Sequence, residues 1–87
     1  MAGYNLIYTR KALKHQKFIE KSPLKHKVKL LLEGLMIDPF DSSYGFEQLK
    51  YFDPARYSKR INVDHRLAYE VYEDLKTIKI LTMWGHY

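Results

Sequence analysis

Residues 24–36 read LKHKVKLLLEGLM, and this stretch has the clearest periodic pattern in the chain. Its apolar residues recur at helical spacing, which places them along one side of an α-helix. We expect Ser22 to cap this helix, Pro23 to occupy its first position, and Asp38-Pro39 to end it. The pattern predicts a helix that buries a single apolar stripe: Leu24, Val28, Leu31, Leu32, Leu35 and Met36.

The segment before this helix has the composition of a short strand followed by a second helix. Residues 4–8 are mostly aromatic and aliphatic, which favours a strand. Thr9 is a suitable N-cap for a helix over residues 10–21. This helix has few apolar residues among many basic ones, so its pattern is weaker than that of residues 24–36.

The segment after residue 45 is β in character, with strands predicted over residues 46–50, 56–62, 66–72 and 77–83. In the last of these, alternation places Ile78, Ile80 and Thr82 on one face and Met83 on the other. Two helices and this series of strands predict an α+β fold, with both helices packed on one face of a mainly antiparallel sheet of four to five strands. At 87 residues, we expect one domain over residues 1–87.

The composition indicates the cellular compartment that we expect for the protein. It contains no cysteine, which excludes a disulfide framework and a thiolate zinc site and fits a reducing compartment. No apolar run approaches the roughly 18 residues of a membrane span, and the first residues lack the features of a signal peptide. We therefore expect a soluble cytoplasmic protein that does not interact with membranes.

The charge suggests a class of partner. Fifteen Lys and Arg against ten Asp and Glu leave a net charge of +5, and thirteen aromatic residues are interleaved with that charge, as eight Tyr, four Phe and one Trp. This mixture suits a polyanion that also offers bases for stacking. The alternative is a solvated basic surface around an aromatic core, and composition alone favours that alternative.

The residues suited to RNA cleavage lie in the β half and at the end of the chain. Cleavage through the 2′-hydroxyl needs a base for its proton, an acid for the departing 5′-oxygen and cations for the charge on phosphorus. Glu47, His86, and Arg60 with Arg66 provide these groups. Alternatively, Glu47 is a surface carboxylate paired with Lys50, and the arginines are ordinary surface cations.

The other histidines have simpler interpretations. His15 and His26 lie among lysines and have no acidic or histidine partner at helical spacing, so we expect no metal site. We interpret His65 as a structural residue whose ring nitrogen satisfies a turn. No cofactor motif is present in the sequence.

An ordered set of motifs resembles one known family. Tyr57-Ser58-Lys59-Arg60-Ile61, His65-Arg66-Leu67-Ala68-Tyr69 and the final Gly85-His86-Tyr87 occur in the order seen in the YoeB/Txe family of RelE-type bacterial toxins. Asp38-Pro39-Phe40 and Glu47-Gln48-Leu49-Lys50 match further parts of that pattern. The resemblance covers nearly the whole chain, and the ordered set is specific although each fragment alone is weak.

The resemblance implies a bacterial toxin of a type II toxin-antitoxin system, with a RelE-like, microbial ribonuclease-type fold. Such a toxin is a ribosome-dependent endoribonuclease that cleaves mRNA in the ribosomal A site, and a cognate antitoxin with an acidic, partly disordered segment holds it inactive. The resemblance also suggests a homodimer. It assigns Glu47 as general base, Arg66 as transition-state stabiliser and His86 as general acid.

The resemblance assigns three further residues to substrate binding, and Trp84 is a fourth candidate at a position where this chain departs from the family. Lys50 and Arg60 would contact phosphate, and Tyr87 would help to place His86 or the substrate. The family often has arginine and tyrosine before the final His-Tyr, whereas this chain has Trp84-Gly85. A cationic contact is therefore missing there, and stacking of Trp84 on a base is one replacement.

Two other functions remain open from the sequence. A basic domain of the same fold is a non-catalytic RNA-binding module if Glu47 and His86 prove dispensable while the cations do not. It is a protein-interaction module if its basic face only receives an acidic antitoxin segment. The order of sensitivity to substitution distinguishes these functions from catalysis.

Overall fold

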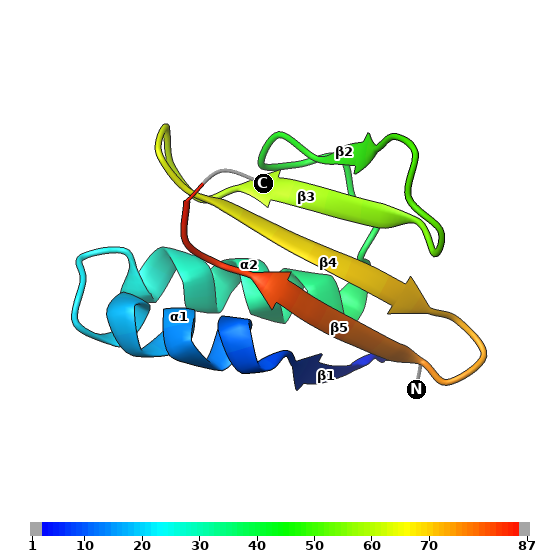
Figure 1. Cartoon of the computed structure of the whole chain (residues 1–87), viewed down its shortest axis with the longest axis horizontal. Helices are drawn as coiled ribbons and strands as arrows, with labels where there is room; N and C mark the ends of the chain where they lie inside the picture. Colours follow the sequence, from blue (N-terminus) through cyan, green and yellow to red (C-terminus); the bar gives the residue numbers. More distant parts are fainter. Residues whose placement is uncertain (1–2, 86–87) are drawn as a thin grey trace.

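The computed structural model describes residues 3–85, and within them the chain forms a five-stranded sheet and two helices (Figure 1). His86 and Tyr87 lie outside the described residues. The elements are β1 (Asn5–Tyr8), α1 (Arg10–Glu20), α2 (Lys25–Ile37), β2 (Glu47–Leu49), β3 (Arg56–Arg60), β4 (Arg66–Tyr72) and β5 (Thr77–Thr82).

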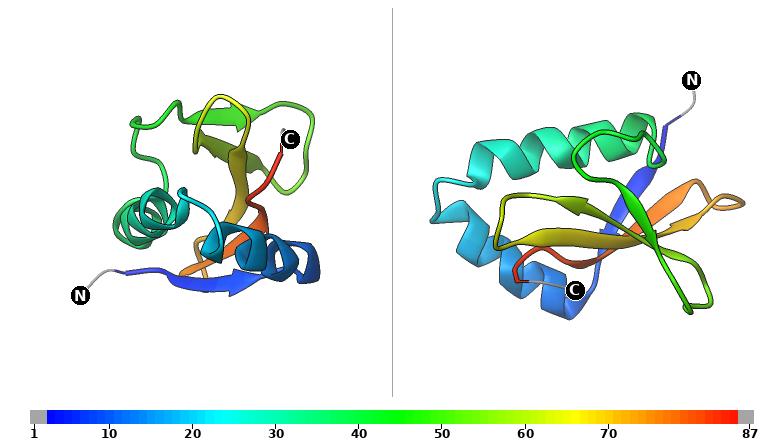
Figure 2. Two further views of the ribbon diagram at one scale, coloured as in Figure 1. Left: turned by 90° about the vertical axis from the view of Figure 1, so that its left-hand side faces the viewer. Right: turned by 90° about the horizontal axis from the view of Figure 1, so that it is seen from above.

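The strand order is β1-β5-β4-β3-β2. Strands β2 to β5 pair antiparallel with their neighbours, whereas β1 pairs parallel with β5. The first and last strands of the sequence are therefore adjacent, and α1 and α2 pack together against one side of the sheet (Figure 2). This arrangement confirms the predicted α+β fold and its RelE/YoeB-like architecture.

The first helix begins as the sequence predicts. The Thr9 hydroxyl accepts a hydrogen bond from the backbone N–H of Ala12 at 3.0 Å. The same hydroxyl donates to the carbonyl of Leu81 at 2.9 Å. Thr9 therefore satisfies a free N–H at the start of α1 and also fastens that end of the helix to β5.

The second helix begins later than predicted, and Ser22 is not its N-cap. The N-cap is Leu24, which makes no side-chain capping bond. Ser22 instead accepts from Leu24 N–H at 3.1 Å and donates to the carbonyl of Ile19 at 2.9 Å. Its hydroxyl is thus used within the tight turn that joins the two helices, and α2 starts only after that turn.

Helix α2 buries a narrower stripe than its periodicity predicts. Val28, Leu31 and Leu35 are buried, Leu24 and Leu32 are partly buried, and Met36 is 41% exposed. Only a narrow strip of the helix surface faces the core, so the residues on either side of that strip stay close to solvent. Its buried residues form one core with those of α1 and the sheet: Ala12, Ile19, Ile61, Leu67, Tyr69, Ile78, Ile80 and Met83.

Leu35→Ala should destabilise the fold by about 2–5 kcal/mol, because Leu35 is fully buried and its truncation leaves a cavity. Leu32→Ala should cost less, because Leu32 is only partly buried. Urea unfolding of both variants measures the difference, with Ile37→Ala, at a position 78% exposed, as the control. An equal loss in Leu32→Ala and Leu35→Ala would contradict this packing.

The last strand departs from simple alternation. Its pairing with β4 shifts register between Ala68 and Tyr69, where Ala68 pairs with Thr82 and Tyr69 pairs with Ile80. This irregularity inserts a residue into β5, so Met83 reaches the core together with Ile80. The prediction that Met83 faces away from Ile80 is therefore wrong. No helix within residues 3–85 is long and apolar enough to cross a bilayer.

Candidate active site

The sheet places four polar side chains of the candidate site on one face. In the antiparallel ladders, Glu47 of β2 pairs with Ser58 of β3, and Arg60 of β3 pairs with Arg66 of β4. Side chains of directly paired residues, and of residues two apart on a strand, share a face. Glu47, Ser58, Arg60 and Arg66 therefore project from the same side of three neighbouring strands.

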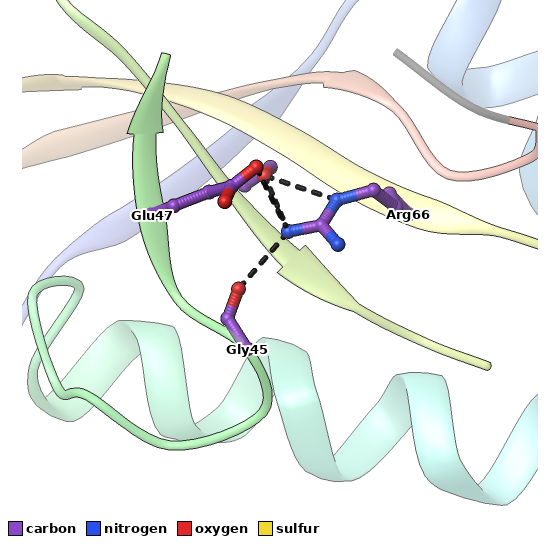
Figure 3. Close-up of polar contacts among 4 residues, drawn as sticks. Gly45, Glu47 and Arg66 are labelled. Carbon is purple, nitrogen blue, oxygen red and sulfur yellow. Dashed lines mark hydrogen bonds and ion pairs between the residues drawn. The ribbon is translucent and has the colours of Figure 1, made fainter. Parts of the chain in front are cut away.

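Three hydrogen bonds to two residues hold the guanidinium of Arg66 (Figure 3). Its Nε and Nη2 donate to the Ser58 hydroxyl at 3.2 and 2.9 Å, and Nη2 donates to the Gly45 carbonyl at 3.0 Å. Nη1 has no hydrogen-bond partner among residues 3–85 and points away from the oxygens that Nε and Nη2 contact (Figure 3). The guanidinium is thus oriented by neutral oxygens and keeps its charge for an anionic ligand.

Glu47 lies beside this guanidinium. Its Oε1 is 3.6 Å from Arg66 Nη2, and its side chain is 60% exposed whereas that of Arg66 is 16% exposed. The distance is an ion-pair contact rather than a short hydrogen bond, and an exposed pair of this kind contributes little to stability. The carboxylate is therefore accessible to a ligand and close to a fixed positive charge. The predicted alternative pairing of Glu47 with Lys50 is not the contact that the structure shows.

A loop over residues 38–45 supplies the Gly45 carbonyl, and Lys59 fixes that loop. Lys59 is 3% exposed, and its Nζ donates to the carbonyls of Asp41 and Ser43 at 2.8 and 3.0 Å. Burial lowers the pKa of Lys59, although Asp41 opposes this effect. Because Lys59 points to the opposite side of β3 from Ser58, it braces the loop from the helical side of the sheet.

The backbone at the end of this loop favours a glycine at position 45. Its φ is +62°, and a Cβ there would approach the Cβ of Arg60 at 3.4 Å. The adjacent Tyr44 carbonyl accepts from the Arg60 N–H at 2.6 Å. At position 45 the chain turns towards Arg66 while the preceding residue stays bonded to the end of β3. This geometry suits a residue that tolerates a left-handed conformation.

The two other predicted cations are exposed and lie near the ends of their strands. Arg60 is the last residue of β3, directly across the ladder from Arg66. Lys50 follows the end of β2. The structure thus gathers Glu47, Arg60 and Arg66, with Lys50 at the far end of the short strand that carries Glu47.

Trp84 has a different environment. Its ring is stacked on His65, with centroids 4.0 Å apart and planes at 27°, and it also lies 5.7 Å from the Phe18 ring. These contacts attach the segment after β5 to helix α1 and to the start of β4. Trp84 is partly buried by this packing, which favours a role in holding the segment over stacking on a base.

Two histidines bind the backbone of the same segment. His65 Nδ1 accepts from the Gly85 N–H at 2.7 Å, and His15 Nδ1 accepts from the Met83 N–H at 3.1 Å. Burial lowers the pKa of His15, and Lys11 and Lys14 lower it further. His65 therefore has the structural role that we predict, although its ring bonds the C-terminal segment rather than a turn. No cluster of potential metal ligands is present among residues 3–85.

Three contributions were not predicted: the Ser58 hydroxyl, the Gly45 carbonyl and the hydrogen bond from Gly85 to His65. Ser58 lies within a motif that the sequence highlights, but its partner depends on the register of β3 and β4. A carbonyl has no side-chain signal at all. The sequence does carry one clue to the third contact, because a glycine directly precedes His86. In the structure this glycine has a φ of +84°, which other residues rarely adopt.

Together these residues can bind a phosphodiester and accept a proton beside it. Arg66 and Arg60 offer positive charge, and Glu47 offers an accessible carboxylate next to that charge. The proton donor that completes acid–base cleavage is assigned to His86, outside the described residues.

Comparison with solved structures defines the class of protein to which this arrangement belongs. The YoeB/ParE toxin from Agrobacterium tumefaciens superposes with a TM-score of 0.85 at 24% identity, over 95% of this chain and 99% of that one. The YoeB dimer from Staphylococcus aureus gives 0.82 at 28% identity, over 97% and 98%. The YoeB–YefM complex from the same organism gives 0.79 at 27% identity, with the same coverage. The chain thus has the fold of the RelE and YoeB toxins.

The family follows from the sequence comparison. Residues 8–87 match the model of the family described as YoeB-like toxin of bacterial type II toxin-antitoxin system. This chain therefore belongs to the YoeB-like toxins, as its resemblance to them predicts. No curated protein sequence gives a significant match.

Proposed function

We propose that this YoeB-like toxin is a ribosome-dependent endoribonuclease that cleaves mRNA in the ribosomal A site and so inhibits translation. Toxins of this family are generally ribonucleases. The observation that carries the proposal is the exposed Glu47 carboxylate, 3.6 Å from an Arg66 guanidinium that Ser58 and Gly45 hold in place. A base and a cation are thus adjacent on one accessible face.

The proposed reaction is an attack by the substrate's own 2′-hydroxyl. Glu47 accepts the hydroxyl proton, the 2′-oxygen bonds to phosphorus, and the bond from phosphorus to the 5′-oxygen breaks. His86 donates a proton to that departing oxygen, which leaves a 2′,3′-cyclic phosphate and a 5′-hydroxyl. Arg66 stabilises the charge that builds on the non-bridging oxygens. All of the acid–base chemistry comes from side chains, so the proposal includes no metal or cofactor.

The remaining assignments concern substrate position. Arg60 lies across the ladder from Arg66, where it would contact the same or the adjacent phosphate. Lys50, exposed beyond the end of β2, would contact phosphate further along the strand of RNA. Tyr87 follows the proposed acid in the sequence and would help to place it. Trp84 would act through the packing of the segment that leads to His86.

The proposed regulator is a cognate antitoxin whose acidic, partly disordered segment folds along the basic face. Two of the similar structures are named as complexes of YoeB with YefM, and another is named as a YoeB dimer. We propose that this chain likewise binds an antitoxin and forms homodimers. Occupancy of the face that carries Glu47 and Arg66 would then prevent RNA from reaching it.

The ribosome is expected to supply the geometry that so small a protein lacks. An exposed carboxylate is a weak base for a 2′-hydroxyl, so the rate must depend on holding the RNA in line for attack. We expect the purified toxin to cleave mRNA on programmed ribosomes at least about tenfold faster than the same RNA in solution. Primer extension against time measures both rates.

The Glu47→Gln protein is the control for contaminating nucleases, because it retains the shape of the side chain and cannot accept the proton. If the Glu47→Gln protein cleaves ribosome-bound mRNA as fast as the wild-type protein, the cleavage does not come from the proposed site. Equal wild-type rates on free and ribosome-bound RNA would contradict ribosome dependence. Ribosome binding without cleavage would identify a non-catalytic RNA-binding module instead.

A further inference from the structure

Two consecutive residues, His65 just before β4 and Arg66 at the start of β4, hold the backbone of Gly85 from both sides. Its N–H donates to His65 Nδ1 at 2.7 Å, and its carbonyl accepts from the Arg66 N–H at 3.0 Å. Gly85 immediately precedes His86, and Arg66 carries the guanidinium of the candidate site. These two bonds therefore connect the residue that precedes the proposed acid to the backbone of the residue that carries the proposed cation.

His65 is itself rigidly placed for this contact. Its backbone N–H donates to Asn62 Oδ1 at 2.8 Å, and its carbonyl accepts from the N–H groups of Ile61 and Asn62 at 2.9 and 3.2 Å. The ring stacks on Trp84 at 4.0 Å. The acceptor of the Gly85 N–H is the lone pair of Nδ1 on this fixed ring.

The conformation of Gly85 makes this contact directional. Its φ is +84°, and a Cβ at this position would meet no atom within 4 Å. The glycine is therefore required by the backbone conformation rather than by lack of space. Hydrogen bonds to its N–H and to its carbonyl therefore fix the backbone of the residue that precedes His86 in the sequence.

We propose that His65 is a positioning residue for the general acid, acting through the hydrogen bond from the Gly85 N–H to its Nδ1. The proposal rests on the proposed function, because it takes His86 as the acid. It assigns His65 no contact with RNA and no transfer of a proton. Its effect should appear in the chemical step, since displacement of a catalytic group by about 1 Å can lower a rate by about 10².

Two substitutions of His65 separate the effect of its hydrogen bond to Gly85 from the effect of its stacking on Trp84. His65→Phe keeps an aromatic ring against Trp84 and removes the acceptor. His65→Asn removes the ring but keeps an acceptor bonded to Cγ, where Nδ1 is also bonded. We expect His65→Phe to lower kcat on programmed ribosomes about tenfold with KM changed less than about twofold, and His65→Asn to recover most of that loss.

His15→Phe is the matched control. It removes the other imidazole acceptor of the segment, which bonds Met83 rather than the residue next to His86. We expect it to lower the unfolding midpoint and to leave kcat within about twofold at a temperature where all variants are folded. An equal loss of kcat in His15→Phe, or no recovery in His65→Asn, would overturn the positioning role.

Amide hydrogen exchange tests the contact without depending on activity. The Gly85 amide should exchange about tenfold faster in His65→Phe than in wild type, and close to the wild-type rate in His65→Asn. Unchanged exchange in His65→Phe would refute the contact itself. Failure of the wild-type protein to cleave mRNA would refute the proposed function, whereas the exchange result would still decide whether His65 holds Gly85.

Discussion

Deletion of His86-Tyr87 should lower the rate of mRNA cleavage on ribosomes by about 10²–10⁴, the range for loss of one general acid or base. Without the acid, the 5′-oxygen must leave unprotonated, and the two histidines that contact the C-terminal segment each already use one ring nitrogen. His65 Nδ1 accepts from Gly85, and His15 Nδ1 accepts from Met83. Single-turnover cleavage followed by primer extension measures the loss.

The same deletion should leave the fold and antitoxin binding intact. Met83 belongs to the core, and within the described part of the chain Trp84 and Gly85 attach the segment that follows it. The unfolding midpoint in urea and binding to the antitoxin are therefore the controls. His86→Gln, with Tyr87 retained, separates the two residues. Retained cleavage in both the deletion and His86→Gln would remove His86 from the mechanism.

Arg66→Lys should lower the cleavage rate by about 10²–10³ with ribosome binding nearly unchanged. Arg66 uses Nε and Nη2 to bond Ser58 and Gly45 and still has Nη1 for a phosphate oxygen. A lysine has one nitrogen and no planar fork, so it cannot hold these partners and face the transition state together. The total charge, which governs association with RNA, stays the same.

Arg10→Lys is the matched control for Arg66→Lys. Arg10 is exposed at the start of α1, so the same change in chemistry there should alter cleavage less than about twofold. Ribosome binding, measured by sedimentation, distinguishes a weaker complex from a slower reaction. Full activity in Arg66→Lys would show that Arg66 contributes only its charge, and lost binding would place Arg66 in association rather than in catalysis.

The candidate site was predictable in its residues but not in its geometry. Glu47, Arg60 and Arg66 stand out in the sequence because RNA cleavage needs a carboxylate and cations and because the family motifs contain them. Their proximity depends on the pairing of β2 with β3 and of β3 with β4. That pairing also brings Ser58 under the guanidinium, a contact that no spacing along the chain predicts.

The sequence by itself determined the local elements. The helical spacing of Val28, Leu31 and Leu35 and the capping hydroxyl of Thr9 are properties of neighbouring residues, so they could be read without a structure. The α+β class follows from the order of those elements. The sequence pattern places the start of α2 too early, because the hydroxyl of Ser22 suits a helix N-cap and also suits the turn that it stabilises.

Only the tertiary structure decided how those elements combine. The parallel pairing of β1 with β5, the register shift that turns Met83 into the core and the burial of Lys59 beneath the loop at residues 38–45 all join distant parts of the chain. The bond between His65 and Gly85 does the same. Periodicity records which face of an element is apolar, whereas register and partner are set by packing across the sheet, and packing has no local signature.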